Sequence, residues 1–379
     1  MLIQQTVVTR LDTGLLGPLR DIAPSLVLVF AAPRFFSDPD FVQKLSEAFP
    51  DARRIAVSTA GEISNQGVSE DSAVVTAIRF ERTPFKLAAT DIAGMDDSLG
   101  AGQRLAEQLQ APDLKAVMLF SQGVAVNGSE LITGMVGVIG KQIPLTGGLA
   151  GDNGAFSQTW TLLDDKVSAK MMLAIGLYGD DFTFAHGSFG GWQSFGPARL
   201  ATKAIGNVLY ELDGEPALDI YRRYLGEYAS GLPASGLLFP FAILADDRQE
   251  TGLLRTLLGI DETVGSLTLA GDIPAGGYLK LMHASTDALI DGAEAAAEAT
   301  LAMMNATGPG LALLVSCIGR KLVMGDRVDE EVEAVAAVFG QHCTLSGFYS
   351  YGEISPFNET TECKLHNQTM TITYLSEKG

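Results

Sequence analysis

The sequence lacks any long uninterrupted run of apolar residues. A membrane-spanning helix needs about 18 or more such residues in succession, and no segment of the 379-residue chain provides them. The first residues, MLIQQTVVTRLD, also lack the basic-then-apolar order of a secretory signal peptide. These absences argue against a membrane protein and against secretion, so we expect a cytoplasmic protein.

Cysteine is scarce as well, with three residues in the whole chain: Cys317, Cys343 and Cys363. An odd number without a CxxC pair argues against a disulfide framework and against a structural zinc site. Cys317 ends the apolar stretch LALLVSC. We therefore expect buried, inert thiols, with a redox or ligand role as the alternative.

Basic residues are outnumbered, with 26 Lys and Arg against 45 Asp and Glu and a formal net charge of −19. The resulting negative potential opposes nucleic acid backbones and anionic membranes as partners. Three catalytic motifs are missing too: the G-x-S-x-G elbow, the H-E-x-x-H pair and the G-x-x-x-x-G-K-[ST] phosphate loop. We therefore expect a protein that is not an enzyme.

What the sequence does contain is one pattern three times: an apolar strand, a helix, a second strand that ends in a small-residue turn, and a further strand. Apolar runs without alternation indicate strands covered on both faces, and the helical stretches carry apolar residues at three-to-four spacing. The three copies span residues 25–63, 114–152 and 310–354, with helices predicted across 41–49, 129–140 and 329–340. This pattern predicts an α/β fold of repeated strand–helix–strand units with mixed sheets.

The stretch 182–300 does not follow this pattern. It reads as a strand, a Gly/Pro-rich loop, a second strand, a helix that begins near Glu215–Pro216, several antiparallel strands and an Ala/Glu-rich closing helix. A chain of 379 residues exceeds one ordinary core, so we predict two lobes. Residues 1–180 form the first domain, and residues 181–379, with the antiparallel insertion and the third unit, form the second.

Inside the sheets we expect the side chains of Val57, Val117 and Leu314, one from each unit. All three belong to apolar runs, and strands of this kind are buried on both faces.

Several motifs occur in an order that resembles one family. TGGLAGD (146–152) is similar to the N-terminal region of FIST proteins, while LYELDGEPALDIYRRYLG (209–226), GFYSYGEI (347–354) and HNQTMTITYL (366–375) are similar to the C-terminal region. The resemblance covers nearly the whole chain and assigns a FIST N-terminal and a FIST C-terminal domain to the two predicted domains. It implies a small-ligand sensor in signal transduction that reports to a histidine kinase or a cyclic-di-nucleotide signalling protein.

A narrower resemblance concerns the ligand. We expect no output domain after the last predicted strand, and solitary FIST proteins are similar to the nitric-oxide-sensing haem proteins of this family. HGSFGGW (186–192) and LMHAST (281–286) support that resemblance, which implies haem as cofactor, nitric oxide as signal and a two-component system with a partner histidine kinase. A haem-free receptor for an amino acid or similar metabolite is the alternative, and a homo-oligomer stays open.

A histidine ligand to haem iron would be one of four residues: His186, His283, His342 or His366. We place His283 first, because related sequences tend to carry another polar residue there. His186 is second, because the glycines and aromatics around it could wall a flat cofactor. His366 lies in a segment that haem-free FIST proteins share, so its expected role is structural, and His342 is expected to complement a helix dipole. An acceptor should lie behind the ligating ring to hold its other N–H.

The turns TAGEI (59–63) and YGEI (351–354) fall at the same step of the first and third units. Glycine in such a turn, as at Gly61, permits a positive φ or close backbone approach, and α/β sheets build pockets at these strand ends. Glu62 and Glu353 are therefore candidates to bind the amino group of a ligand, or to act as paired catalytic carboxylates in an enzyme. The alternative is that each caps a backbone N–H.

Tyr349 and Tyr351 alternate with Phe348 along a strand end, so the tyrosines point to one face and the phenylalanine to the other. One set belongs to the core, and the other is a candidate floor for a ligand pocket, because ligand sites are largely apolar with a few polar groups. Together with Gly61, Glu62 and Glu353, the two tyrosines complete the predicted ligand-binding set.

Overall fold

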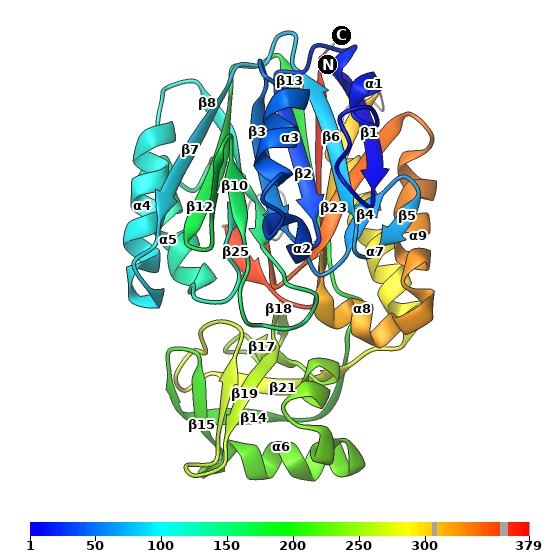
Figure 1. Ribbon diagram of the computed structural model, residues 1–379. Coiled ribbons are helices and arrows are strands. Elements are labelled where there is room, and N and C mark those ends of the chain that lie inside the picture. Colours follow the sequence, from blue (N-terminus) through cyan, green and yellow to red (C-terminus); the bar gives the residue numbers. More distant parts are fainter. Residues whose placement is uncertain (305–308, 357–362, 379) are drawn as a thin grey trace.

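The computed structural model describes residues 1–304, 309–356 and 363–378. This described part contains nine α-helices and four sheets that are mixed or antiparallel. The predicted α/β fold class is therefore confirmed. Figure 1 shows a larger body, which holds the three repeated units, above a smaller body of strands that includes helix α6 (Ala217–Leu225).

Each repeated unit has a first strand, a helix, a parallel second strand and an antiparallel third strand. The elements of the first unit are β2 (Leu26–Ala31), α3 (Phe41–Ala48), β3 (Arg53–Ser58) and β6 (Ala73–Arg79). Those of the second are β8 (Leu114–Ser121), α5 (Gly128–Ile139), β9 (Leu145–Leu149) and β12 (Met171–Tyr178). Those of the third are β22 (Gly310–Cys317), α9 (Asp329–Phe339), β23 (Cys343–Ser350) and β26 (Met370–Glu377). All three predicted central helices are present, so the strand–helix–strand repeat is confirmed.

Each unit also lends a hairpin to the sheet of another unit. The first unit's hairpin extends the third sheet through β23, the second unit's extends the first sheet through β3, and the third unit's extends the second sheet through β9. The hairpins are β4 (Glu62–Ser64) with β5 (Gly67–Ser69), β10 (Thr161–Leu163) with β11 (Lys166–Ser168), and β24 (Gly352–Pro356) with β25 (Cys363–His366). The three six-stranded sheets are therefore linked in a ring.

One further strand completes the opposite edge of each sheet. These strands are β1 (Leu2–Val8), β7 (Phe85–Asp91) and β13 (Phe182–Phe189). The predicted boundary at residues 180–181 falls just before β13, and as a domain boundary it stays a prediction. The strand pairing itself places the third unit in the larger body with the first two, through β23–β4 and β24–β9, rather than with the insertion.

The strands of each unit are buried on both faces, which explains their continuous apolar sequence. Along β2, Leu28 and Phe30 face a central core shared by the three sheets, while Val29 faces the outer layer with the helix residues Phe41 and Leu45. Alternation of period two along a strand produces this division.

The centre of the molecule is aromatic. The ring of Phe30 stacks on that of Phe348 with centroids 4.8 Å apart, and Phe120 lies 6.0 Å from the first and 6.4 Å from the second. One ring comes from each unit, so this cluster ties all three together. The predicted inside residues are all fully buried: Val57, Val117 and Leu314.

A long insertion separates β13 from the helix before the third unit, α7 (Thr286–Ala302). In the second unit only residues 92–97 join the equivalent elements, β7 and α4 (Ser98–Leu109). The strands of the insertion are β14 (Gln193–Ile205), β15 (Val208–Leu212), β16 (Glu215–Pro216), β17 (Phe241–Leu244), β18 (Glu250–Arg255), β19 (Leu257–Asp261), β20 (Ser266–Leu269) and β21 (Tyr278–His283). They form one antiparallel sheet.

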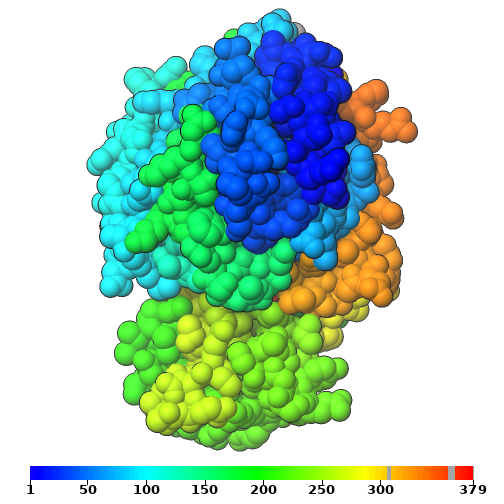
Figure 2. Space-filling view, in the orientation of Figure 1, coloured from blue at the N-terminus to red at the C-terminus, as the bar shows by residue number. Residues whose placement is uncertain are grey.

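The insertion has its own apolar core, in which α6 (Ala217–Leu225) covers the sheet with Tyr221 and Leu218. Pro216 stands at the N-cap of this helix, close to the predicted start. Figure 2 shows the insertion as the green-to-yellow mass beneath the larger body and in direct contact with it.

The remaining helical segments are α1 (Gly17–Arg20), α2 (Pro33–Phe36), α8 (Ile318–Met324), and the 3-10 turns η1 (Met95–Asp97), η2 (Gly226–Gly231), η3 (Ala234–Leu238) and η4 (Gly325–Arg327). No described helix has both the length and the apolar character that a membrane crossing requires.

Candidate functional site

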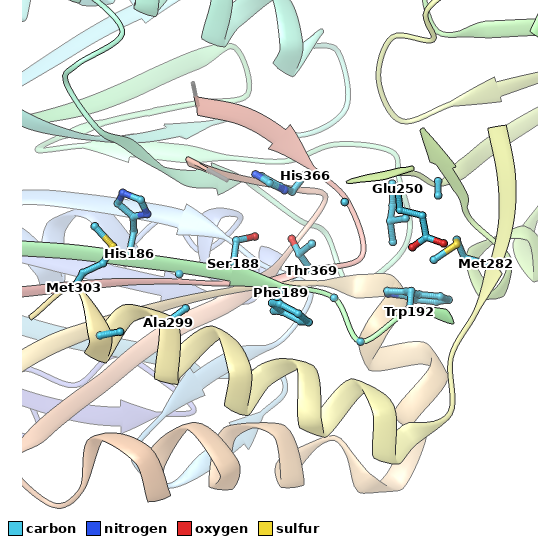
Figure 3. A pocket seen from close by; sticks show the side chains of 17 residues that line it. His186, Ser188, Phe189, Trp192, Glu250, Met282, Ala299, Met303, His366 and Thr369 are labelled. Atoms are coloured by element: carbon cyan, nitrogen blue, oxygen red, sulfur yellow. The ribbon is translucent and has the colours of Figure 1, made fainter. Parts of the chain in front are cut away.

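A cavity of about 600 Å³ lies where the insertion meets the larger body, and we call it the junction cavity. Four parts of the chain build its wall: β13 with the loop after it, the end of α7, the insertion strands β17, β18 and β21, and residues just before β26. Figure 3 shows these side chains around the cavity. The lining residues are His186, Gly187, Ser188, Phe189, Gly190, Gly191, Trp192, Ala242, Glu250, Gly252, Leu254, Met282, Ala299, Ala302, Met303, His366 and Thr369.

Glycines bring the loop after β13 into contact with α7. A Cβ atom on Gly187 would lie 2.1 Å from the carbonyl oxygen of Ala296, and one on Gly191 would lie 1.9 Å from that of Ala288. Gly191 also has a φ of +74°, which disfavours other residues. The glycines of HGSFGGW therefore allow the strand, the loop and the helix to pack closely enough to form one wall.

Trp192 fixes the far end of this loop. Its indole Nε1 donates a hydrogen bond of 2.8 Å to the backbone oxygen of Gln368. The indole ring itself lines the junction cavity near Met282 and Glu250, which belong to the insertion (Figure 3). This tryptophan thus touches the core of the protein and the insertion at the same time.

His186 lies in β13 at the other end of the cavity and is 6% exposed. Burial lowers the pKa of its imidazole to about 4, so the ring is neutral at physiological pH. The imidazole ring of His186 forms no hydrogen bond with any residue in the described part of the chain, although its backbone pairs with Thr373 of β26. A buried, neutral imidazole that faces a cavity without a protein partner is available to hold a ligand or to coordinate a metal.

His366 also borders the cavity, and its ring is hydrogen-bonded within the fold. Its Nε2 donates a hydrogen bond of 2.9 Å to the carbonyl oxygen of Ser355. Burial lowers its pKa to about 4. The structural role expected for His366 stays a prediction.

His283, the first choice from the sequence, lies outside the junction cavity. It is exposed at the end of β21 and borders an open groove of about 600 Å³ between the insertion and α8. The edge of Phe195 lies against its ring, with centroids 5.5 Å apart. The hydrogen-bond acceptor that we expected behind this ring is not found among the described residues. The apolar and aromatic neighbours in this lateral groove are Phe195, Tyr228, Leu238, Phe239, Leu322 and Val323. The remaining histidine, His342, is exposed in the turn before β23.

The two glutamates of the GEI turns occupy equivalent positions and make equivalent bonds. Glu62 is fully buried and accepts hydrogen bonds from the hydroxyl of Thr59 and from the amide and hydroxyl of Ser72. Glu353 is fully buried and accepts from the hydroxyl of Ser350 and from the amide and hydroxyl of Thr369. Each glutamate therefore accepts a hydrogen bond from a backbone N–H, which is the alternative stated above for the two GEI turns.

Burial raises the pKa of both carboxyl groups, that of Glu353 to about 8. Neither side chain lines the junction cavity, although Glu353 holds the cavity-lining Thr369 in place. A part in ligand binding for either acid, or in catalysis, stays a prediction.

The other predicted ligand-binding residues are packed inside the protein. The hydroxyl of Tyr349 donates a 2.5 Å hydrogen bond to Glu331, and that of Tyr351 donates to Asp152. Gly61 has a φ of +133° and its carbonyl accepts from the amide of Tyr349. The structure brings these residues to neighbouring strand ends but does not place them on the wall of the junction cavity.

Sequence reasoning missed most of the cavity. Glu250, Leu254 and Met282 come from strands of the insertion, and Ala299 and Met303 from the end of α7, so no local pattern joins them. The three glycines between His186 and Trp192 were the one signal available, because they indicate a backbone that another element approaches closely.

Comparison with known proteins gives the chain a family. The FIST N domain matches residues 25–215 and the FIST C domain residues 217–356. The chain is 34% identical over 97 residues to the uncharacterized protein MJ1623 of Methanocaldococcus jannaschii, which is 24% of this chain and 18% of that protein. The match therefore spans about a fifth of the length of that relative.

Among solved structures the chain is similar to the cyanuric acid hydrolase from A. caulinodans, with a TM-score of 0.40 and 8% identity over 100% of this chain and 99% of that one. A likeness at this level supports no conclusion about fold or activity. The two domain matches cover most of the chain and are decisive: this protein belongs to the FIST family of sensory, signal-transducing domains.

Proposed function

We propose that this protein is a small-ligand sensor whose ligand occupies the junction cavity. One observation carries the proposal. The wall of the cavity is shared between the larger body, through His186, Trp192 and Thr369, and the insertion, through Leu254 and Met282. An occupant must contact both parts, so its binding favours one arrangement of the insertion on the core over others.

The lining constrains the chemistry of the ligand. Most of the wall is apolar or aromatic, with Phe189, Trp192 and Met303 among its larger side chains, and the cavity volume is that of a typical small-molecule site. His186 offers a neutral imidazole. Within the described residues the wall contains no lysine or arginine, and the carboxylate of Glu250 borders it. A largely apolar ligand with a group that meets an imidazole fits this site best.

The finer form of the proposal is a haem-bound sensor of nitric oxide. The neutral ring of His186 is the chain's best iron ligand, since its nitrogen lone pair is not used by a described residue, and the apolar wall suits the flat faces of a porphyrin. The propionate groups of haem would form no ion pair with the described residues of the cavity wall, because these include no lysine or arginine. Haem would supply an iron centre that binds nitric oxide. His283 in the lateral groove is the second choice, because it is exposed.

A haem-free form uses the same cavity for an apolar metabolite. An amino acid held by the GEI acids is less well supported, because Glu62 and Glu353 are fully buried and already accept hydrogen bonds within the protein.

The partner that reads the sensor is, in this proposal, a histidine kinase or a cyclic-di-nucleotide signalling protein. The family supports a signalling partner, and the net charge of −19 favours one with a basic surface. Adding protein to a cognate kinase should change its autophosphorylation, and salt should weaken the effect because it screens the attraction. Unchanged phosphorylation with both ligand-free and loaded protein would remove this part of the proposal.

The test of the site is a hemin titration followed by absorption spectroscopy. Wild-type protein should give a Soret band that shifts when nitric oxide is added, H186A should lose the normal band, and the exposed-site variant H342A should keep it. Loss in H283A instead of H186A would move the site to the lateral groove.

A second pair of variants tests the cavity without assuming the iron ligand. A299F fills the junction cavity, while E298F adds the same side chain to an exposed position of the same helix. Binding that survives A299F and is lost in E298F would refute the location of the site. Wild-type protein that stays colourless with hemin would exclude the haem form and leave the metabolite form.

A further inference from the structure

One arginine is completely buried beside the junction cavity. Arg320 lies in α8 and is 0% exposed. Its guanidinium donates at 2.5 Å to the carbonyl oxygen of Gly190 in the cavity loop, at 2.7 Å to that of Leu289 in α7, and at 2.8 Å and 3.1 Å to Glu331 in α9. One side chain therefore connects the cavity wall to two helices of the larger body.

The partner of Arg320 is equally constrained. Glu331 is 0% exposed, and its second carboxylate oxygen accepts hydrogen bonds of 2.9 Å from Ser316 and 2.5 Å from Tyr349. With the two bonds from the guanidinium, both oxygens of this carboxylate are occupied. A shift of Arg320 must therefore move Glu331 or leave buried charge without its partner.

The loop at the cavity end of this network is packed between α7 and the insertion. Between Gly190 and Trp192 the chain is anchored by the Arg320–Gly190 bond, by the bond from the indole to Gln368 and by close packing on α7. The indole ring of Trp192 faces the cavity. A ligand that displaces this ring pulls on the segment that Arg320 holds.

We propose that Arg320 couples the junction cavity to helix α9, so that displacement of the Gly190–Trp192 loop by a ligand is passed to α9 through the buried Arg320–Glu331 pair. As a signalling device this relay rests on the proposed function, since it needs a ligand in the cavity. A buried ion pair is weak evidence for stability, because an apolar pair of the same size often serves as well. It does impose a defined geometry, because the planar guanidinium has fixed donor directions. Arg320 is in this sense a positioning residue.

The test measures amide hydrogen exchange across α9 and needs no ligand. W192F perturbs the loop from the cavity side: it removes the indole donor and keeps an aromatic ring. The double variant R320M/E331L removes both buried charges together, which proteins tolerate better than the loss of one. W160F is the matched control, because Trp160 packs in the outer layer of the first unit.

In the native background W192F should accelerate exchange in α9 by at least about fivefold, the lower end of allosteric couplings, and W160F should not. In the R320M/E331L background W192F should have no such effect. Equal acceleration in both backgrounds, or none in the native one, overturns the relay. If the double variant does not fold, R320K takes its place as the background for W192F. Lysine keeps the positive charge but lacks the planar, forked set of N–H donors of the guanidinium. Failure of hemin to bind counts against the haem form of the proposed function and not against the relay, because this comparison is made on ligand-free protein.

Discussion

Replacing Glu353 with glutamine should make the protein more stable at alkaline pH. Burial raises the pKa of this carboxyl from 4.5 to about 8, so the folded protein keeps a proton that the unfolded chain releases. Between these two values the folded state binds more protons, and the free energy of unfolding therefore falls as pH rises. At about 1.4 kcal/mol per pH unit, the difference amounts to on the order of 5 kcal/mol above pH 8. This is an upper limit, because relaxation of the site and water entry reduce the cost of a buried charge.

The assay is urea unfolding of wild type and E353Q at several values between pH 5 and pH 9. Glutamine resembles the protonated acid, so E353Q should match the wild type near pH 5 and become progressively more stable relative to it as pH rises. E298Q, at an exposed position of α7, is the control and should show no such trend. A gap between E353Q and wild type that stays constant with pH would refute the argument. A gap that favours the wild type more at high pH would mean that the carboxylate is ionised and held by Thr369 and Ser350.

Three further outcomes follow from the packing. Gly187→Ala should cost about 1–3 kcal/mol in urea unfolding, because the new methyl would meet a backbone oxygen at 2.1 Å, whereas Gly137→Ala, with no atom within 4 Å, should not destabilise. Phe348→Ala should cost about 3–5 kcal/mol by the same assay, since it empties the centre of the molecule. Burial lowers the pKa of His186 from 6.5 to about 4. The contribution of the neutral ring to the free energy of unfolding is therefore fully present above pH 6.5 and is lost as the pH falls toward 4. His186→Phe should remove about 3 kcal/mol of that acid loss in pH-dependent unfolding, and an unchanged acid slope would contradict the neutral assignment.

The repeated units could be predicted from the sequence because their signals are local. Continuous apolar runs mark strands that are covered on both faces, and three-to-four spacing marks the helices between them. The turn chemistry of the insertion, from Pro216 to the strands after it, was equally readable. What the sequence did not reveal is the exchange of hairpins between sheets. Strands of three residues such as β4 carry too little pattern to choose a partner, and that choice depends on the assembled ring of sheets.

The candidate site was harder to predict for a related reason. Its wall joins side chains more than a hundred residues apart, such as His186 and Met303, and their meeting depends on the placement of α7 against β13. His283 looked favourable because related sequences tend to carry another polar residue at that position, yet its ring borders the groove between the insertion and α8 and not the junction cavity. Nothing in the sequence distinguished Arg320 from its neighbour Lys321 in the short helix α8, since the burial of the Arg320 side chain depends on Glu331 eleven residues later.

The position of the junction cavity follows from how the insertion enters the repeat. In the second unit the edge strand β7 passes to helix α4 through residues 92–97. In the third unit the same step, from β13 to α7, contains the whole insertion, so both ends of the inserted sheet are tethered to the root of one strand and one helix. The strand and helix still pack as their counterparts do, through Gly187 against Ala296. The inserted strands therefore lie across the ends of β13 and α7, and the space beneath these strands is the junction cavity. A ligand in the junction cavity would therefore contact the first of the two connections between insertion and core, the segment from Gly190 to Trp192.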